Sequence, residues 1–372
     1  MMYLDYSATT PVNNEVLEAF TKFNQDYFAN PNSTHELGLL TKLQIDKATL
    51  DIKKTLGIDA FEVIYTSGAT ESNNLALKGY ALGNQHLGKH IISTPYEHSS
   101  VTTCLNYLEK CGFEVDILDI NESGLIDLTE LEKLIRSDTI LVSIALINSE
   151  VGIKQNLEKI TNILKKHPHV RFHSDMTQAI GKQKVDLSNV DLVSFTAHKI
   201  YGLKGIGVLL RRKNLNLTPV VHGGKSTSIF RGGTPPAPLI YSLAIALKLA
   251  YEDFDKKLKY IQTLYDYLCN DLLPQIECAH INYKYGVPQI VNVSFTEIYA
   301  GKLLKELSKR HIIISTQTAC SSEASYSATV KRITFSDKLA KTSVRISISH
   351  LTQKKELDEL IIAIKEILHE NS

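Results

Sequence analysis

The feature that most constrains the fold is an alternation between Phe61 and Leu210, where short β-branched runs take turns with longer segments of helical periodicity. The run 140–147 is apolar throughout, which is typical of a strand buried on both faces. Strands that alternate with helices in this way form a mostly parallel sheet with helices on both faces. We therefore predict an α/β fold.

The expected elements follow this pattern along the 372 residues. Strands are expected at 61–66, 90–94, 113–118, 140–147, 170–173 and 192–195, with a return strand at 207–210. Helices are expected at 72–82, 101–110, 129–136 and 157–166, and a long helical stretch follows Pro238 to about residue 273. Strands near 290–295, 311–315 and 344–348, with a helix after Thr352, predict a smaller α+β C-terminal domain.

The charge balance argues against two classes of partner. Lys and Arg number 41 against 40 Asp and Glu, so no field of the whole chain would attract nucleic acid or a membrane surface. The longest apolar runs have the length of strands, too short to cross a bilayer, and no basic-then-apolar signal precedes the first strand. We expect a cytoplasmic protein with no direct contact to nucleic acid or membrane. The five cysteines include no pair at C-x-x-C spacing, which disfavours a zinc site.

Ligands of parallel sheets bind beyond the carboxyl ends of the strands, so the residues there are the candidates for function. The first strand runs into Thr66-Ser-Gly-Ala-Thr-Glu-Ser72, which either cradles a phosphate or simply caps a helix. The segment is not a nucleoside triphosphate loop, and no G-x-G-x-x-G follows a strand, so a dinucleotide site is disfavoured.

Three other strand ends carry groups that can do chemistry. His98 and Asp175 could be ordinary helix-capping residues, whereas Lys199 follows a buried strand and precedes a glycine-rich segment, an unusual place for a solvated charge. A desolvated lysine amine is a nucleophile for carbonyl groups. A lysine that can form a Schiff base, an aspartate, a histidine and a phosphate cradle together are what a pyridoxal phosphate enzyme needs.

At this point the chain resembles a known family, the NifS/IscS-like cysteine desulfurases, in the class V aminotransferase group of fold-type I pyridoxal phosphate enzymes. The resemblance covers essentially the whole chain, in the family's order. It rests on the segments 3–11, 30–33, 66–72, 97–98, 148–152, 174–178, 194–202, 222–224, 231–234, 319–321 and 344–347. It implies a large cofactor-binding domain at 14–250 and a small domain made of 1–13 and 251–372.

The resemblance also implies catalytic roles. Lys199 would hold pyridoxal 5′-phosphate as a Schiff base and move the substrate's α-proton, and His98 would stack on the cofactor ring and serve in acid–base steps. Cys320, in the polar run 316–325, would accept the substrate sulfur as a persulfide. Nothing basic flanks Cys320, so we expect no local charge to activate its thiol in the resting enzyme.

Binding roles are implied in the same way. Asp175 would pair with the pyridine nitrogen, and Gln178 would reach the ring hydroxyl. The residues expected at the cofactor phosphate are Ala69, Thr70, Thr196 and His198, with Thr234 supplied by the second subunit of a homodimer. Asn148 and Arg345 would bind the substrate carboxylate, for which the Arg fork is suited. No metal ligand is expected.

The chain departs from the family pattern at several positions. Met176 replaces the usual alanine after the aspartate, and Thr196-Ala197 replaces a Ser-Gly pair. Lys225 and Thr227 stand where a glycine and a glutamate are usual, which bears on the subunit interface.

The leading hypothesis is therefore a cysteine desulfurase that converts L-cysteine to L-alanine and passes the Cys320 persulfide sulfur to a protein acceptor. The acceptor could serve iron–sulfur cluster assembly, a thio-cofactor or tRNA thiolation. Alternatives on the same scaffold are a selenocysteine lyase, an aminotransferase or a β-lyase, and fold alone does not separate them. A catalytically silent assembly protein is a further alternative.

Overall fold

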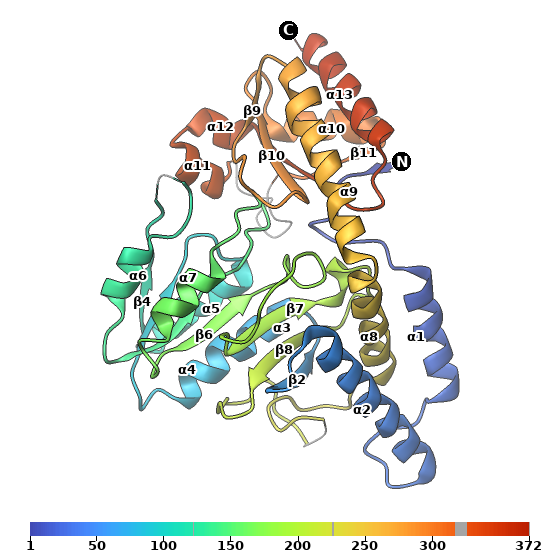
Figure 1. The fold of residues 1–372 in the computed structure, drawn as a ribbon, viewed down its shortest axis with the longest axis vertical. Coiled ribbons are helices and arrows are strands. Elements are labelled where there is room, and N and C mark those ends of the chain that lie inside the picture. Colours follow the sequence, from blue (N-terminus) through green and yellow to red (C-terminus); the bar gives the residue numbers. More distant parts are fainter. Residues whose placement is uncertain (122, 225–226, 317–325, 372) are drawn as a thin grey trace.

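A seven-stranded sheet organises the larger part of the computed structural model, which describes residues 1–121, 123–224, 227–316 and 326–371 (Figure 1). In these residues the strand order is β2-β8-β7-β6-β5-β3-β4. The bounds are β2 (Phe61–Thr66), β3 (His90–Ser93), β4 (Glu114–Ile117), β5 (Thr139–Ser143), β6 (Arg171–Asp175), β7 (Leu192–Thr196) and β8 (Gly207–Arg212). Only the pairs made by β8 are antiparallel in this sheet. The predicted α/β fold with a mostly parallel sheet is confirmed.

Helices cover both faces of the sheet because successive strand residues point to opposite sides. Val63 and Tyr65 of β2 pack in one hydrophobic cluster and Ile64 in another. The first cluster contains residues of α1 (Asn14–Asp26), α2 (Glu36–Leu56), α6 (Leu128–Leu134), α7 (Leu157–Leu164) and α8 (Ala237–Tyr251). The second contains residues of the π-helical turn Leu75–Gly79, α4 (Tyr80–Gly83) and α5 (Ser99–Lys110), and α3 (Ala69–Asn74) runs directly into that turn.

A smaller part with its own hydrophobic cluster lies above the main sheet in Figure 1. Its antiparallel sheet has the order β12-β10-β9, formed by β9 (Ala279–Ile281), β10 (Ile290–Phe295) and β12 (Ser343–Ser347). The N-terminal β1 (Met2–Tyr3) pairs in parallel with β11 (Ile312–Ile313). The helices here are α9 (Phe254–Asp266), α10 (Ala300–Lys309), α11 (Ala328–Thr334), α12 (Asp337–Thr342) and α13 (Lys354–His369).

Two elements differ from the expectation. The helical stretch after Pro238 is broken between α8 and α9, where Asp253 adopts the left-handed region with φ 48°. The predicted strand 140–147 ends at Ser143, although Ile144 and Leu146 still donate backbone hydrogen bonds to β6 residues. Beyond them the chain turns back on itself, because Asn148 N–H donates to Ile153 O (2.9 Å). This turn directs residues 148–150 away from the sheet.

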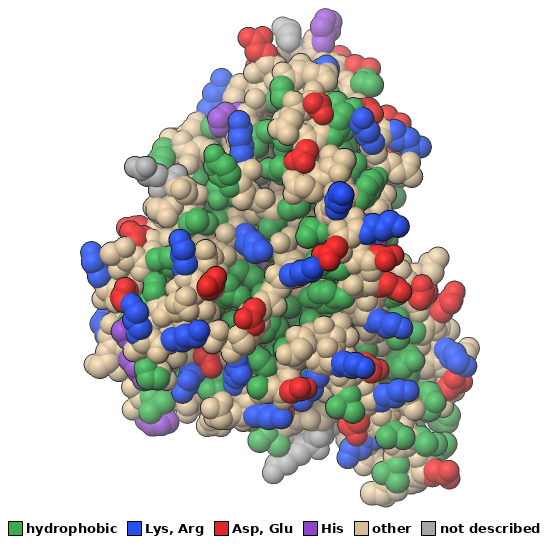
Figure 2. Space-filling model, in the orientation of Figure 1, with side chains coloured by type: hydrophobic (Ala, Val, Ile, Leu, Met, Phe, Trp, Pro, Cys, Tyr) green, Lys and Arg blue, Asp and Glu red, His purple; other side chains and the backbone are tan. Residues whose placement is uncertain are grey.

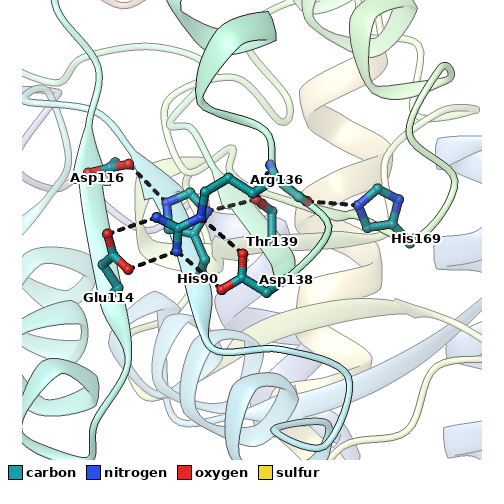
Figure 3. Close-up of polar contacts among 7 residues, drawn as sticks. All are labelled: His90, Glu114, Asp116, Arg136, Asp138, Thr139 and His169. Carbon is teal, nitrogen blue, oxygen red and sulfur yellow. Dashed lines mark hydrogen bonds and ion pairs between the residues drawn. The ribbon is translucent and has the colours of Figure 1, made fainter.

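A polar cluster ties together the amino ends of β3, β4 and β5 (Figure 3). The fully buried His90 contacts Thr139 Oγ1 through Nδ1 (2.7 Å) and Asp116 Oδ2 through Nε2 (3.0 Å). Arg136 forms a bidentate pair with Glu114 at 2.8 Å and also contacts Asp138. This edge is opposite to the carboxyl ends, where chemistry was predicted.

The surface in Figure 2 carries charges of both signs, interspersed rather than gathered in one patch. Hydrophobic side chains cluster at the lower right of that view, over the region of α2. Leucines on α2 account for this, with exposed fractions of 40–66%: Leu37, Leu39, Leu40, Leu43 and Leu50. Within the described ranges, no helix is both long enough and apolar enough to cross a membrane.

Candidate functional site

A cavity of about 430 Å³ opens at the carboxyl ends of the parallel strands, where the sequence predicted a site. Its wall includes residues that follow β2, β3, β5, β6 and β7, together with Ser7, Ala8 and Arg345 from the smaller part. Of the predicted residues, it brings together His98, Asp175, Gln178, Lys199, Ala69, Thr70, Thr196, His198 and Arg345. A larger cavity of about 560 Å³ shares Ser7 with it but has a wall dominated by α1, α8 and α9.

Lys199 lies at the end of a 3-10 turn, Ala197–Lys199, that directly follows β7. Its ammonium donates a hydrogen bond to the backbone carbonyl of Ser7 (2.5 Å). A carbonyl of the N-terminal segment therefore orients the amine toward the cavity.

Asp175 ends β6 and is buried, with 8% of its surface exposed. Its Oδ1 accepts from Thr177 N–H (3.0 Å), and its Oδ2 accepts from Asn73 Nδ2 (2.8 Å). Hydrogen bonds to both oxygens hold the carboxylate in one orientation. Asp175 thus presents a fixed negative charge at the cavity wall.

His98 is the N-cap of α5, and its Nδ1 accepts from Ser100 N–H (3.1 Å). Burial lowers the pKa of His98, the charge of Asp175 opposes that shift, and the charge of Lys199 adds to it. The neighbouring Glu97 is enclosed as well: burial raises the pKa of its carboxyl to about 8.

Gln178 is held between two groups that sequence reasoning had not connected to it. Its Nε2 donates to Ser7 O (3.0 Å), and its Oε1 accepts from Lys182 Nζ (2.7 Å). Because a backbone carbonyl can only accept, Ser7 O fixes the amide with its NH₂ group toward Ser7 and its oxygen toward Lys182. Burial first, and then the charges of Lys199 and Arg345, lower the pKa of Lys182 well below its ordinary value.

One corner of the cavity is shaped by a close backbone approach. A Cβ at Gly207 would lie 2.4–2.8 Å from backbone atoms of Gly68, so only glycine fits there. Gly68 precedes α3, whose first N–H groups have no acceptors within the helix. Thr196 and His198 line the same cavity, and burial lowers the pKa of His198 to about 4. Backbone donors and small residues here can hold an anionic group.

Arg345 on β12 is 1% exposed and reaches the cavity from the smaller part. Its guanidinium donates to Asp5 Oδ1 (2.7 Å) and Ser149 O (2.9 Å). Its Nε has no hydrogen-bond partner among the described residues. A buried, partly unsatisfied guanidinium beside a cavity is suited to bind a carboxylate.

Two predicted residues, Asn148 and Thr234, are not among the described residues that line the cavity. The Asn148 side chain accepts from Glu150 and Val151 N–H (both 2.9 Å) and donates to Tyr96 O (3.1 Å). Thr234 is exposed on the loop before α8. Cys320 lies outside the described residues, as does Lys225. Of the other departures, Met176 is fully buried in the hydrophobic core and Thr227 is exposed.

The structure adds residues that the sequence did not single out: Ser7, Asp5, Asn73, Ser100 and Lys182. Asp5 and Ser7 belong to segment 3–11, which is one of the segments on which the family resemblance rests. That resemblance was the signal in the sequence that could have pointed to them. Asn73 and Lys182 carry no such signal because they act through neighbouring side chains.

Comparison with known proteins identifies the family of the chain. The sequence model of the aminotransferase class-V family matches residues 2–360. The cysteine desulfurase IscS of Dictyoglomus turgidum is 36% identical over 99% of this chain and 94% of its own length. The mitochondrial cysteine desulfurase of Eremothecium gossypii is 40% identical over 98% of this chain and 75% of its own length.

Solved structures are also similar to this chain over nearly its whole length. A NifS-like protein superposes with a TM-score of 0.93 at 34% identity, covering 99% of both chains. A structure described as SspA in complex with cysteine has a TM-score of 0.83 at 32% identity, covering 95% of this chain and 100% of that one.

Proposed function

Because the chain belongs to the aminotransferase class-V family, we propose that it is a cysteine desulfurase with pyridoxal 5′-phosphate bound at the carboxyl ends of the strands. The family depends on this cofactor. Relatives that match 98–99% of this chain at 36% and 40% identity are cysteine desulfurases. The observation that carries the proposal is the convergence of Lys199, Asp175 and His98 on one cavity.

The residues of the cavity fit the cofactor. The Asp175 carboxylate is buried and hydrogen-bonded on both oxygens, as a partner for a protonated pyridine nitrogen must be. A Cβ at Gly68 would meet only Thr196 Oγ1, at 4.0 Å, which leaves space for a phosphate at the start of α3. We assign the phosphate to Ala69, Thr70, Thr196 and His198, and the ring hydroxyl to Gln178.

When bound, pyridoxal phosphate supplies an aldehyde for amines and a protonated ring that withdraws electrons from the substrate's α-carbon. Lys199 would hold the cofactor through Nζ and would take the substrate's α-proton at that atom. Asp175 would keep the proton on the pyridine nitrogen, and His98 would stack on the ring.

Arg345 is assigned to the substrate carboxylate. Its two terminal nitrogens now pair with Asp5 and Ser149, so a bound carboxylate competes with Asp5 for the fork. Asn148 is assigned to the same carboxylate through Nδ2, which must then leave Tyr96 O.

Cys320 is assigned as the sulfur acceptor. The described residues that flank its segment are anchored near the cavity: Ser315 pairs with Arg345 through backbone hydrogen bonds, and Ser327 donates to Glu150. The Cys320 sulfur bonds to the substrate sulfur as the carbon–sulfur bond breaks, and the electron pair left on carbon takes a proton. Cysteine and thiol thus give alanine and a persulfide with no external oxidant.

A homodimer with shared sites is part of the proposal. Thr234 is exposed and does not line the cavity of its own chain, and the exposed leucines of α2 offer an apolar face to a second copy. Thr234 would then complete the phosphate site of the partner.

The domain division and the cell compartment are proposals too. A small domain made of 1–13 and 251–372 is supported by the β1–β11 pairing and by the cluster that buries Met2 and Leu4 with C-terminal residues. The free thiols of Cys104 and Cys269 are compatible with a reducing cytoplasm. The persulfide sulfur would pass to a protein acceptor, for iron–sulfur cluster assembly, a thio-cofactor or tRNA thiolation.

The test separates cofactor binding from sulfur transfer. Lys199→Ala should lose the visible absorption of the bound cofactor and all turnover, because its amine is the group assigned to hold the cofactor. Cys320→Ala should keep that absorption and its change on adding L-cysteine, yet form no persulfide and almost no sulfide. Cys111→Ala, which removes a partly exposed thiol on the C-terminal side of α5, is the matched control. Sulfide release by Cys320→Ala near the parent rate would replace the desulfurase by a lyase.

A further inference from the structure

A chain of hydrogen bonds connects Asp175 to His98 behind the cavity wall. Asn73 Nδ2 donates to Asp175 Oδ2 (2.8 Å) and to Ser100 Oγ (2.8 Å), and Ser100 Oγ lies 2.9 Å from His98 Nδ1. Asn73 and Ser100 are buried, at 0% and 7% exposure. The four residues come from β6, α3 and the start of α5, so the chain exists only in the folded protein.

The direction of each bond follows from the Asp175 carboxylate. An ionised carboxylate only accepts, so it fixes the Asn73 amide with its NH₂ group toward Asp175. The second hydrogen of that NH₂ group points at Ser100 Oγ, which must accept it. The Ser100 hydroxyl hydrogen is then free to donate to His98 Nδ1.

The helix cap imposes the same requirement independently. Ser100 N–H donates to His98 Nδ1 (3.1 Å), and a backbone N–H cannot accept. With two donors aimed at it, Nδ1 carries no proton. The single proton of the neutral ring is therefore on Nε2.

The orientation of Asn73 is kept at a cost. Its Oδ1 is buried without a hydrogen-bond partner in the described part of the chain, and a buried acceptor left without a donor destabilises the fold. Rotating the amide would not remove this cost, because Oδ1 would then face the Asp175 carboxylate. The arrangement is thus dictated by Asp175.

We propose that Asn73 and Ser100 are positioning residues that hold neutral His98 with its proton on Nε2, so that His98 meets the cofactor site as a hydrogen-bond donor. This inference rests on the proposed function only for the identity of the group that His98 faces. The two residues then have different roles in the cavity: His98 donates a hydrogen bond, and Lys199 is the group that takes a proton.

The charged and titratable groups around His98 agree with a neutral ring. Lys199 faces it after β7, Asp175 after β6, and Glu97 precedes it in the chain. Burial and Lys199 favour the neutral form, whereas Asp175 favours the charged one. If Nδ1 of His98 were protonated, its N–H would face the Ser100 backbone N–H, and two hydrogen-bond donors would then repel each other.

The direct test is the tautomer of His98 in the holoenzyme. Ring ¹⁵N–¹H correlation spectra of ¹⁵N-histidine protein would show the 13 histidines, with His98 identified as the signal missing from His98→Gln. We expect Nε2 protonated and Nδ1 bare at neutral pH. A protonated Nδ1 would overturn the proposal. The readout does not depend on sulfide release, so it stands apart from a failure of the desulfurase assignment.

A double-mutant cycle tests the order of the chain. Ser100→Ala should raise the pKa of His98 by about half to one unit, the worth of one hydrogen bond to Nδ1. Asn73→Ala should raise it in the same direction, because the Ser100 hydroxyl can then turn and accept from Nδ1. In the Ser100→Ala background, Asn73→Ala should add nothing. Ser99→Ala, at an exposed position of the same turn, is the control. Additive effects, or no change in either single variant, would contradict the chain.

Discussion

Glu97 is an acid kept protonated by its surroundings. Its Oε1 accepts from Thr94 Oγ1 and Ala145 N–H (both 2.7 Å), while its Oε2 is buried with no partner among the residues described. Burial, the largest cause, raises the pKa to about 8, and the charge of Asp175 adds to it. At neutral pH the folded protein therefore carries a proton on Glu97 that the unfolded chain has released.

Stability should consequently fall as pH rises from the ordinary Glu value, 4.5, toward 8, because the folded state binds the extra proton throughout that window. Glu97→Gln should remove this contribution, making the variant more stable than the parent at pH 8, relative to pH 5, by a few kcal/mol, on the order of the pKa shift. Urea unfolding of both proteins at several pH values checks this. Glu109→Gln, which changes an exposed carboxyl group on α5, is the control. A difference in unfolding free energy between the parent and Glu97→Gln that is the same at every pH would refute the raised pKa of Glu97.

How much of the site could be predicted from the sequence depended on where each residue sits. Lys199, Asp175 and His98 follow strands directly, so the parallel sheet alone brings them together. Ser7 and Asn73 could not be found this way: Ser7 is 192 residues from Lys199, and Asn73 acts from inside α3, 102 residues from Asp175. Their contacts depend on tertiary packing, which no local pattern encodes.

At the scale of elements, His90 joins three strands through one side chain. Arg136 N–H donates to Thr139 Oγ1 (2.7 Å), so the Thr139 hydroxyl donates to His90 Nδ1, and His90 Nε2–H donates to Asp116 (Figure 3). The imidazole on β3 thereby links β5 on one side to β4 on the other. By comparison, the Arg136 ion pairs are exposed and contribute little.

His90→Phe should lower the free energy of unfolding by about 1–3 kcal/mol, because it leaves the buried Thr139 hydroxyl without an acceptor. His169→Ala, which removes an exposed histidine of the same cluster, should change it by less than about 0.5 kcal/mol. Chemical denaturation of the three proteins measures both. Equal losses of unfolding free energy in the two variants would show that the hydrogen bonds of His90 to the neighbouring strands add no more stability than the exposed His169.

The elements were predicted best where one pattern governed them. The strand expected at 61–66 is β2 to the residue, because its flanking turns are set by sequence. The helix break at Asp253 was missed because the apolar periodicity continues across it, and only packing against the main sheet forces the left-handed residue. The expected strand 140–147 was too long, because buried apolar residues continue into the turn.

At the scale of the whole molecule, the proposed homodimer, in which each subunit completes the other's phosphate site, predicts the activity of dimers made of two different variants. Lys199→Ala and Thr234→Arg should each be inactive alone, the first for lack of the amine and the second because a bulky side chain enters the partner's phosphate site. Coexpressed, they should recover about a quarter of parent activity, since half of random pairs are mixed and each mixed pair has one intact site. Activity no higher than that of the separate variants would exclude sharing through Thr234.

The pairing of Asp5 with Arg345 spans 340 residues of sequence, and it has a consequence for how the protein is made. A ribosome that adds about 5–20 residues per second needs on the order of 20–70 s between these two residues. During that interval the first residues of the chain have no partner strand, since β1 pairs with β11. The cavity closes only when synthesis is nearly complete. Chains that end before Arg345 lack the guanidinium that we assign to the substrate carboxylate, and we expect them to release no sulfur.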